Sequence, residues 1–207
     1  MKKNLFLIIL HISIFIFAQQ KKKNIYYPQA FFDKKLAKEM LGYGNSTIRG
    51  VASTREKQNV PFTLGLVKMK TGKKHVAREG TVVTLIPVTP YFEEFYKLRK
   101  SHENKNTAVY MSEEAFKYRI DTTTDENGRF QFEKMKPGKY YIETILDFTA
   151  QESYRQQVGT EKGYNVYGSV VYSRPIYQTF FYDYETSSRE SKFVEIKSDG
   201  QVIDIKL

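Results

Sequence analysis

The chain of 207 residues contains no cysteine and no tryptophan, and only three histidines. Without cysteine it has neither disulfide bonds nor a thiol nucleophile, so its stability must come from a hydrophobic core. A zinc peptidase needs histidine and glutamate ligands at defined spacing, and neither His75 nor His102 lies in such a motif. We interpret both as surface histidines in loops. We therefore expect no catalytic residue, no metal and no cofactor.

The sequence has a single long apolar run, at its N-terminus. Two lysines precede a run from Leu5 to Phe17, which ends at Ala18 before polar chain. A positive start, a short apolar stretch and a small exit residue are typical of a secretory signal peptide, whereas a membrane anchor needs about 20 apolar residues. We expect residues 1–18 to be removed as a signal peptide. The mature protein is then secreted or periplasmic, with no stable membrane insertion.

Acidic residues are outnumbered, with 33 Lys and Arg against 23 Asp and Glu, which gives a formal net charge of +10. A basic chain can attract anionic partners, nucleic acid among them. Because acidic and basic residues are interspersed, we interpret the excess as solubility charge spread over a domain. The predicted export signal argues against nucleic acid as a partner. The sequence leaves the oligomeric state open.

Tyrosine and phenylalanine are abundant, at 16 and 15 residues, and turn residues are frequent, a composition that favours β structure. The strongest predicted strand, residues 81–88, has apolar residues at both odd-numbered and even-numbered positions. Because successive side chains of a strand point to opposite faces, this pattern indicates burial on both faces. We predict a mainly β, antiparallel, Ig-like sandwich over residues 46–207, with short helical insertions at about 90–118 and 149–190. Residues 19–45 form a lead-in with one short helix.

Three turn motifs are predicted to reverse the chain between neighbouring antiparallel strands. Asn127 and Gly128 supply positive φ at low steric cost. Pro137 fixes φ at the first central position of a second turn, and Gly138 tolerates φ above zero at the next. A third turn, at residues 198–200, is predicted to join the last two strands as a terminal hairpin.

These motifs carry a family resemblance. Gly50, the strand at residues 82–89, the T-D-E-N-G-R-F-Q-F motif at 124–132 and the K-P-G-K-Y-Y motif at 136–141 resemble the carboxypeptidase regulatory-like domain. That family belongs to the transthyretin-like, or prealbumin-like, β-sandwiches, near the starch-binding-domain-like folds. The resemblance spans roughly residues 46–148. It implies a transthyretin-like sandwich with an accessory, stabilising or binding role, and it does not imply peptidase activity.

Tyrosines crowd into one segment near the C-terminus. Exposed tyrosines can stack against sugar rings or anchor a protein interface, although tyrosine is also ordinary strand material. The candidate binding surface consists of Tyr164, Tyr167, Tyr172, Tyr177, Tyr182 and Tyr184, with residues 91–105 as a second element.

The sequence predicts an exported, non-catalytic module that binds or supports an unknown protein or glycan at the cell envelope or outside the cell. One alternative is a carbohydrate-binding module that uses these tyrosines. A further alternative is a hydrolase, which would need ionisable groups converging in a pocket.

Overall fold

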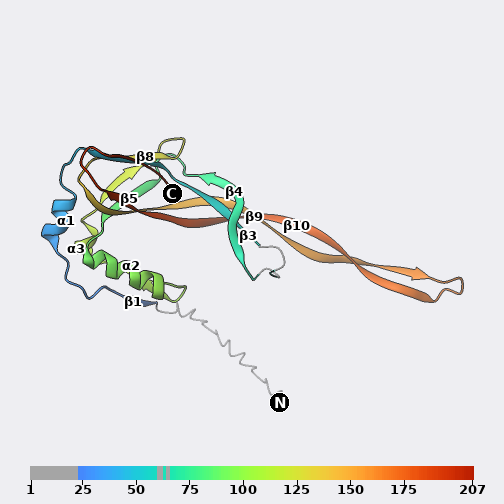
Figure 1. Ribbon diagram of the computed structural model, residues 1–207. Coiled ribbons are helices and arrows are strands. Elements are labelled where there is room, and N and C mark those ends of the chain that lie inside the picture. The colour runs from blue at the N-terminus through green and yellow to red at the C-terminus, as the bar shows by residue number, and fades with distance from the viewer. Residues whose placement is uncertain (1–22, 60–62, 64–65) are drawn as a thin grey trace, which may run out of the picture.

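Two β-sheets face each other and hold the main hydrophobic core between them (Figure 1). The computed structural model describes residues 23–59, 63 and 66–207, and the predicted signal peptide, residues 1–18, lies outside this part of the chain. The first sheet has the order β10-β9-β5-β7 and the second the order β11-β2-β8. These strands are β2 (Ser46–Val51), β5 (Val82–Pro87), β7 (Ile120–Thr123), β8 (Arg129–Met135), β9 (Gly138–Tyr164), β10 (Val170–Ile196) and β11 (Val202–Lys206). The predicted mainly β sandwich is confirmed.

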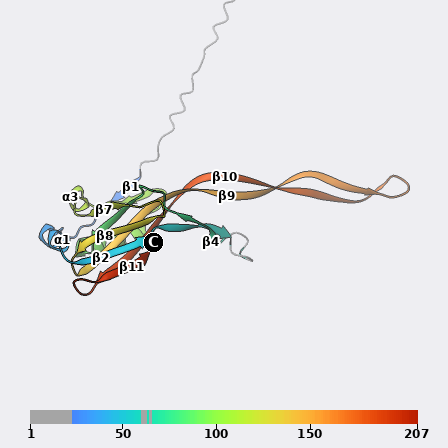
Figure 2. The same cartoon turned by 90° about the horizontal axis from the view of Figure 1, so that it is seen from above.

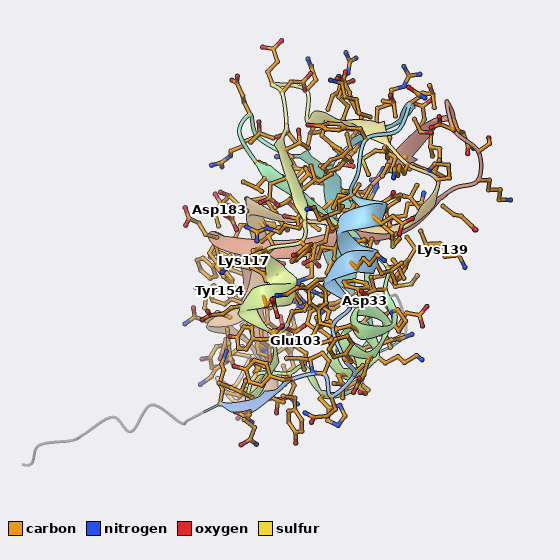
Figure 3. The ribbon with its side chains drawn as sticks, turned by 90° about the vertical axis from the view of Figure 1, so that its left-hand side faces the viewer. Asp33, Glu103, Lys117, Lys139, Tyr154 and Asp183 are labelled. Atoms are coloured by element: carbon orange, nitrogen blue, oxygen red, sulfur yellow. The ribbon has the colours of Figure 1, made fainter. Side chains whose placement is uncertain are left out.

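Seven further elements flank the two sheets in the described part of the chain. They are β1 (Asn24–Tyr26), α1 (Lys34–Met40), β3 (Ser53–Asn59), β4 (Lys68–Val76), α2 (Pro90–His102), β6 (Thr107–Val109) and α3 (Glu113–Phe116). β3 and β4 form an antiparallel pair, whereas β1 pairs with β6 in parallel. Figure 3 views the molecule from one end, with α1 and α3 nearest the viewer.

Polar side chains cap the N-terminal ends of helices α1 and α3. The carboxylate of Asp33 accepts a hydrogen bond from the backbone N–H of Leu36 at 3.0 Å, at the start of α1. The hydroxyl of Ser112, at the start of α3, accepts a hydrogen bond from the N–H of Ala115 at 3.2 Å. Such bonds satisfy N–H groups that the first helical turn leaves without partners.

β5 is buried on both faces, as its sequence predicts. Val83 and Leu85 lie in the core between the two sheets, and Ile86 lies in a second cluster on the outer face of the first sheet. The adjacent strand β9 repeats this division, with Tyr140 in the first cluster and Tyr141 in the second. The centre of the first sheet is therefore covered on both sides.

Helix α2 covers that outer face. Phe92 and Phe95 are buried in the second cluster, and the buried Arg99 forms an ion pair with Glu143 of β9, with Nη1 and Oε2 3.0 Å apart. Arg99 also donates a hydrogen bond to the hydroxyl of Tyr141. The aromatic residues of this helix, which falls within the predicted recognition segment 91–105, therefore serve mainly to pack it onto the sheet.

The turn predicted at Asn127-Gly128 is present, but the hairpin predicted around it is wrong. Gly128 has φ +69°, and the carboxylate of Asp125 accepts hydrogen bonds from the N–H groups of Asn127 and Arg129 at 2.9 and 2.7 Å. The flanking strands β7 and β8 pair with β5 and β2 respectively, in different sheets. The turn therefore passes the chain from one sheet to the other.

The other two predicted turns behave in the same way. Pro137 follows β8 of the second sheet, and Gly138 begins β9 of the first. Ser198–Gly200 leads from β10 of the first sheet to β11 of the second, so the predicted terminal hairpin is also wrong. β11 runs parallel to β2, whereas the other pairings within the two sheets are antiparallel, so the predicted antiparallel pattern has one exception. Apolar burial between the sheets decides these pairings, because each turn motif fixes only its own backbone angles.

The predicted insertion at residues 149–190 is the outer part of one long hairpin. β9 and β10 are 27 residues each and pair antiparallel from Gly138 and Ile196 to Tyr164 and Val170. In Figures 1 and 2 this hairpin leaves the sandwich and extends far beyond it, away from α1 and α3. β5 pairs with β9 only up to Thr144.

Replacing Gly128 by alanine should cost more than the same change at Gly80. Both glycines have positive φ, +69° and +79°, but a Cβ at residue 128 would lie 2.4 Å from Cγ1 of Val76, whereas nothing lies within 4 Å of one at residue 80. We expect a loss of roughly 1 kcal/mol for Gly80→Ala from backbone strain alone, and at least about 2 kcal/mol for Gly128→Ala. Urea unfolding of both variants measures the difference. Equal losses would show that the crossing at residue 128 is not crowded.

The two buried tyrosines of β9 should make the fold sensitive to alkali. Burial raises the pKa of Tyr140 and of Tyr141 to about 12, above the value of about 10 for an unfolded chain. Each phenol holds its proton more tightly in the folded state, so its contribution to stability is complete below about pH 10 and is lost as the pH rises toward about 12.

Denaturant unfolding across that pH range should therefore show a falling free energy of unfolding, by up to ~2–3 kcal/mol for each phenol. A Tyr140→Phe/Tyr141→Phe double variant, although less stable at neutral pH, should lose less across the same interval. An equal slope in both proteins would contradict this assignment.

Candidate functional site

The outer part of the long hairpin, residues 151–185, is the most exposed structure in the described chain, and we call it the arm. None of its residues is buried. The two strands pair throughout, with register shifts at Val158 in β9 and at Val171 in β10. Both faces of the arm are open to solvent. Figures 1 and 2 show it as a twisted two-stranded ribbon.

The register divides the six predicted tyrosines between different surfaces. Because β10 alternates without interruption from Tyr172 to Ile196, even-numbered and odd-numbered residues lie on opposite faces. Tyr172, Tyr182 and Tyr184 share one face, which we call the even face, and Tyr177 lies on the other. Tyr164 ends β9 and Tyr167 lies in the connecting turn. The six therefore do not form one platform.

The even face carries an aromatic row that includes residues the sequence analysis missed. Tyr154 of β9 and Phe180 of β10 stack with their ring centroids 5.5 Å apart and their planes at 22°. Tyr154 also lies 6.2 Å from Tyr182, which lies 6.0 Å from Tyr184. Only the pairing of β9 with β10 brings Tyr154 to this row, because it lies outside the crowded tyrosine segment. Cross-strand spacing would have found it once the hairpin was known.

A carboxylate organises the inner end of this row. Glu152 accepts hydrogen bonds from the hydroxyls of Tyr182 and Tyr184 at 3.1 and 3.4 Å, and from Nζ of Lys68 in β4 at 2.8 Å. The hydrogen bond from Lys68, followed by that from Tyr182, lowers the pKa of Glu152. The same bond to Glu152 raises the pKa of Tyr182. Through these hydrogen bonds, Glu152 of β9 links side chains of β4 and β10 at this end of the row.

The tip of the arm is an ordered turn that displays apolar side chains. The side-chain oxygen of Asn165 accepts hydrogen bonds from the N–H groups of Tyr167 and Ser169 at 3.0 and 2.9 Å, and Gly168 has φ +77°. Val166 and Tyr167 are 93% and 89% exposed, which makes them the most exposed large hydrophobic residues of the described chain. Residues 163–173 contain no charged side chain.

The β3–β4 hairpin packs against the even face where the arm meets the sandwich. His75 of β4 stacks on Phe148 of β9 at 4.6 Å, and its Nε2 lies 2.7 Å from Oε1 of Glu56. The prediction that His75 lies in a surface loop is therefore wrong, because it is a half-buried strand residue. His102 is exposed at the end of α2.

Glu190 of β10 fixes the same region. Its carboxylate accepts hydrogen bonds from Lys70 and from the hydroxyl of Thr54, the latter at 2.5 Å. Desolvation raises the pKa of Glu190, but the hydrogen bonds from Lys70, Thr54 and Ser188 outweigh it, so the pKa is lowered. The root of the arm is thus tied to two further strands.

Several concave regions lie on the sandwich, among them the following two. The larger, of about 690 Å³, is lined by residues of β2, β7, β8 and β11, and includes the ion pair between Arg49 and Asp204, with Nε and Oδ1 2.5 Å apart. The second, of about 520 Å³, lies between α2 and the inner ends of β9 and β10, beside Tyr96 and Phe193.

Within the described ranges, no group of three or more His, Asp or Glu side chains is placed so that it could hold a metal ion.

None of the helices in the described part of the chain is long and apolar enough to cross a bilayer. No protein-family model and no curated protein matches the sequence. Among solved structures, the chain is similar to a Pseudomonas aeruginosa protein described as a candidate carbohydrate-binding protein, with 18% sequence identity and a TM-score of 0.49. The match covers 86% of this chain and 99% of that one.

Proposed function

We propose that this protein is an exported, non-catalytic binding or structural accessory module of the cell envelope, and that the arm is its interaction element. The observation that carries the proposal is the exposure of the arm. Among residues 151–185 every side chain is at least partly open to solvent, and Tyr154, Ile176 and Phe181 are 50%, 46% and 67% exposed. Folded chains seldom leave so extended an apolar surface without a use.

The energetics of a two-stranded ribbon support the same conclusion. An isolated hairpin is at best marginally stable in water, and a free strand edge readily pairs with another chain. The arm contributes nothing to either hydrophobic cluster of the sandwich. Stability of the fold therefore does not explain why the chain has the arm, whereas binding of a partner would explain it.

The export of the protein is supported by the signal-like pattern of residues 1–18. We propose no catalytic role, since the two histidines of the described chain are engaged elsewhere. His75 contacts Glu56 and Phe148, and His102 contacts Ser101 and the backbone of Leu98.

A glycan is the second candidate partner, and the even face favours it. Tyr154, Phe180, Tyr182 and Tyr184 present ring surface beside the carboxylate of Glu152, and Gln156 and Gln178 pair across the strands further along the same face. Aromatic rings flanked by carboxylate and amide groups can stack on a sugar ring and bind its hydroxyls.

Removal of the arm should abolish association with the cell envelope and leave the sandwich intact. Ser153 and Phe181 pair directly across the two strands, so an Asn-Gly turn can join them in place of residues 154–180. We expect the melting temperature to stay within a few degrees, because both hydrophobic clusters are retained. Co-sedimentation with an envelope fraction compares the two proteins, and equal retention would refute the proposal.

The glycan candidate predicts a face-specific effect. Tyr182→Ala should weaken binding of a glycan-array hit by at least about tenfold, whereas Tyr177→Ala, on the opposite face, should leave it unchanged. Calorimetric titration of both variants measures this. A wild-type protein that binds no glycan on the array would eliminate the candidate.

A further inference from the structure

We propose that the partner of the arm is a second copy of this chain, and that two arms lie antiparallel, joined along the free edge of β9. This rests on the proposed function, since it names the partner of the same element. The pairing would merge two ribbons into one four-stranded sheet, with each tip beside the root of the other arm. Three separate properties of the arm support it.

The first property is an open backbone edge. β9 pairs with β10 along its whole length and with β5 only up to Thr144, so the other edge of residues 145–164 has no strand partner within the described chain. Such an edge carries a row of free N–H and C=O groups. No proline interrupts it, whereas β10 carries Pro175, a residue that natural sheets place on edges that stay unpaired. The structure therefore favours β9 as the joining strand.

The second property is the charge of the arm, which selects the antiparallel orientation. The arm has three basic and four acidic residues, a net charge of −1, while the rest of the chain has +11. Its outer half, residues 158–176, has a net charge of +1, and its inner half has −2. Antiparallel arms bring halves of opposite sign together, and parallel arms would bring like charges together. Antiparallel arms also keep the two basic sandwiches at opposite ends.

The third property is apolar surface at both ends of the arm. The tip carries Val166 and Tyr167, and near the root, beside the contact of Lys68 with Glu152, the exposed residues Leu66 and Met69 are 87% and 55% open to solvent. The distance from Glu152 to Tyr164 is about 40 Å for an extended strand. In a full antiparallel overlap each tip therefore reaches the apolar residues at the root of the other copy.

A twofold axis closes this arrangement at two chains. In an isologous pair both copies use the same surface, so the two joined β9 edges are fully paired with each other. A third chain cannot add to them, and no filament grows through this contact. The even face and the opposite face of each arm remain open. Dimerisation along β9 is therefore compatible with ligand binding on the aromatic row.

Sedimentation equilibrium of the full chain over a wide concentration range is the first test. We expect a dimer, which the variant with Asn-Gly in place of residues 154–180 should lose. Lys162→Glu gives the outer half a net charge of −1 against an inner half of −2, so it should raise the dissociation constant by at least about fivefold. Adding Glu185→Lys makes the inner half neutral and removes this repulsion, so the double variant should recover much of the loss. Neither residue has an ion-pair partner among the described residues.

Single introduced cysteines test the orientation, because the natural chain has none. Val158 lies at the middle of the joined edge, so Val158→Cys should form a disulfide-linked dimer under mild oxidation. Ser169→Cys, at the tip, should not, whereas a mixture of Ser169→Cys and Gln151→Cys should form a mixed dimer.

The outcomes separate this inference from the proposed function. A wild-type protein that is monomeric at every concentration, or efficient self-linking through Ser169→Cys, would overturn the antiparallel dimer. If the wild type is monomeric but removal of the arm still abolishes envelope or glycan binding, the arm remains the interaction element and only its partner has been misidentified. If the dimer forms and persists without the arm, this inference fails, while the proposed function is decided separately by co-sedimentation of the shortened protein with the envelope fraction.

Discussion

The structure depends on the burial of both faces of β9 where it leaves Gly138. Tyr140 and Ile142 are held in the core between the sheets, while Tyr141 is held beneath α2, and all three are at most 1% exposed. A strand fixed on both faces cannot rotate or slip by one residue without turning its apolar side chains outward. Because β9 continues unbroken into the arm, this anchorage also sets the direction in which the arm projects.

Part of this architecture could be predicted from the sequence. The buried strand at residues 82–88, the helix that follows it and the cap at Ser112 are all local patterns, and the structure contains each of them. The turns at residues 127–128, 137–138 and 198–200 were found for the same reason. Their pairings could not be predicted, because a turn motif specifies backbone angles whereas the partner of a strand is decided by burial across the sandwich.

The candidate site shows the same limit. Tyrosine crowding drew attention to residues 164–184, but it could not reveal that Tyr177 faces away from Tyr182. That division follows from the strand register, and register in a solvent-exposed ribbon leaves little hydrophobic pattern to read. Tyr154 and Glu152 were missed because their relation to the tyrosines exists only across the hairpin.

The molecule thus separates two tasks. The sandwich and α2 contain the buried apolar residues and most of the positive charge, and they hold the hairpin at its root through contacts such as Glu190 with Thr54 and Arg99 with Glu143. The arm is nearly neutral and lies outside both clusters. Substitutions in it can therefore change recognition with little effect on the fold, which is the usual relation between a rigid scaffold and the segment it displays.

The turn held by Asn165 also bears on how the protein folds. Bringing Gly138 directly against Ile196 would close a long loop, and the entropy cost of closure rises with loop length. A tip that forms through nearby hydrogen bonds lets the two strands zip inward pair by pair, so that each step closes only a short additional segment. The element most distant from the core is thus the one best suited to nucleate the longest pairing in the molecule.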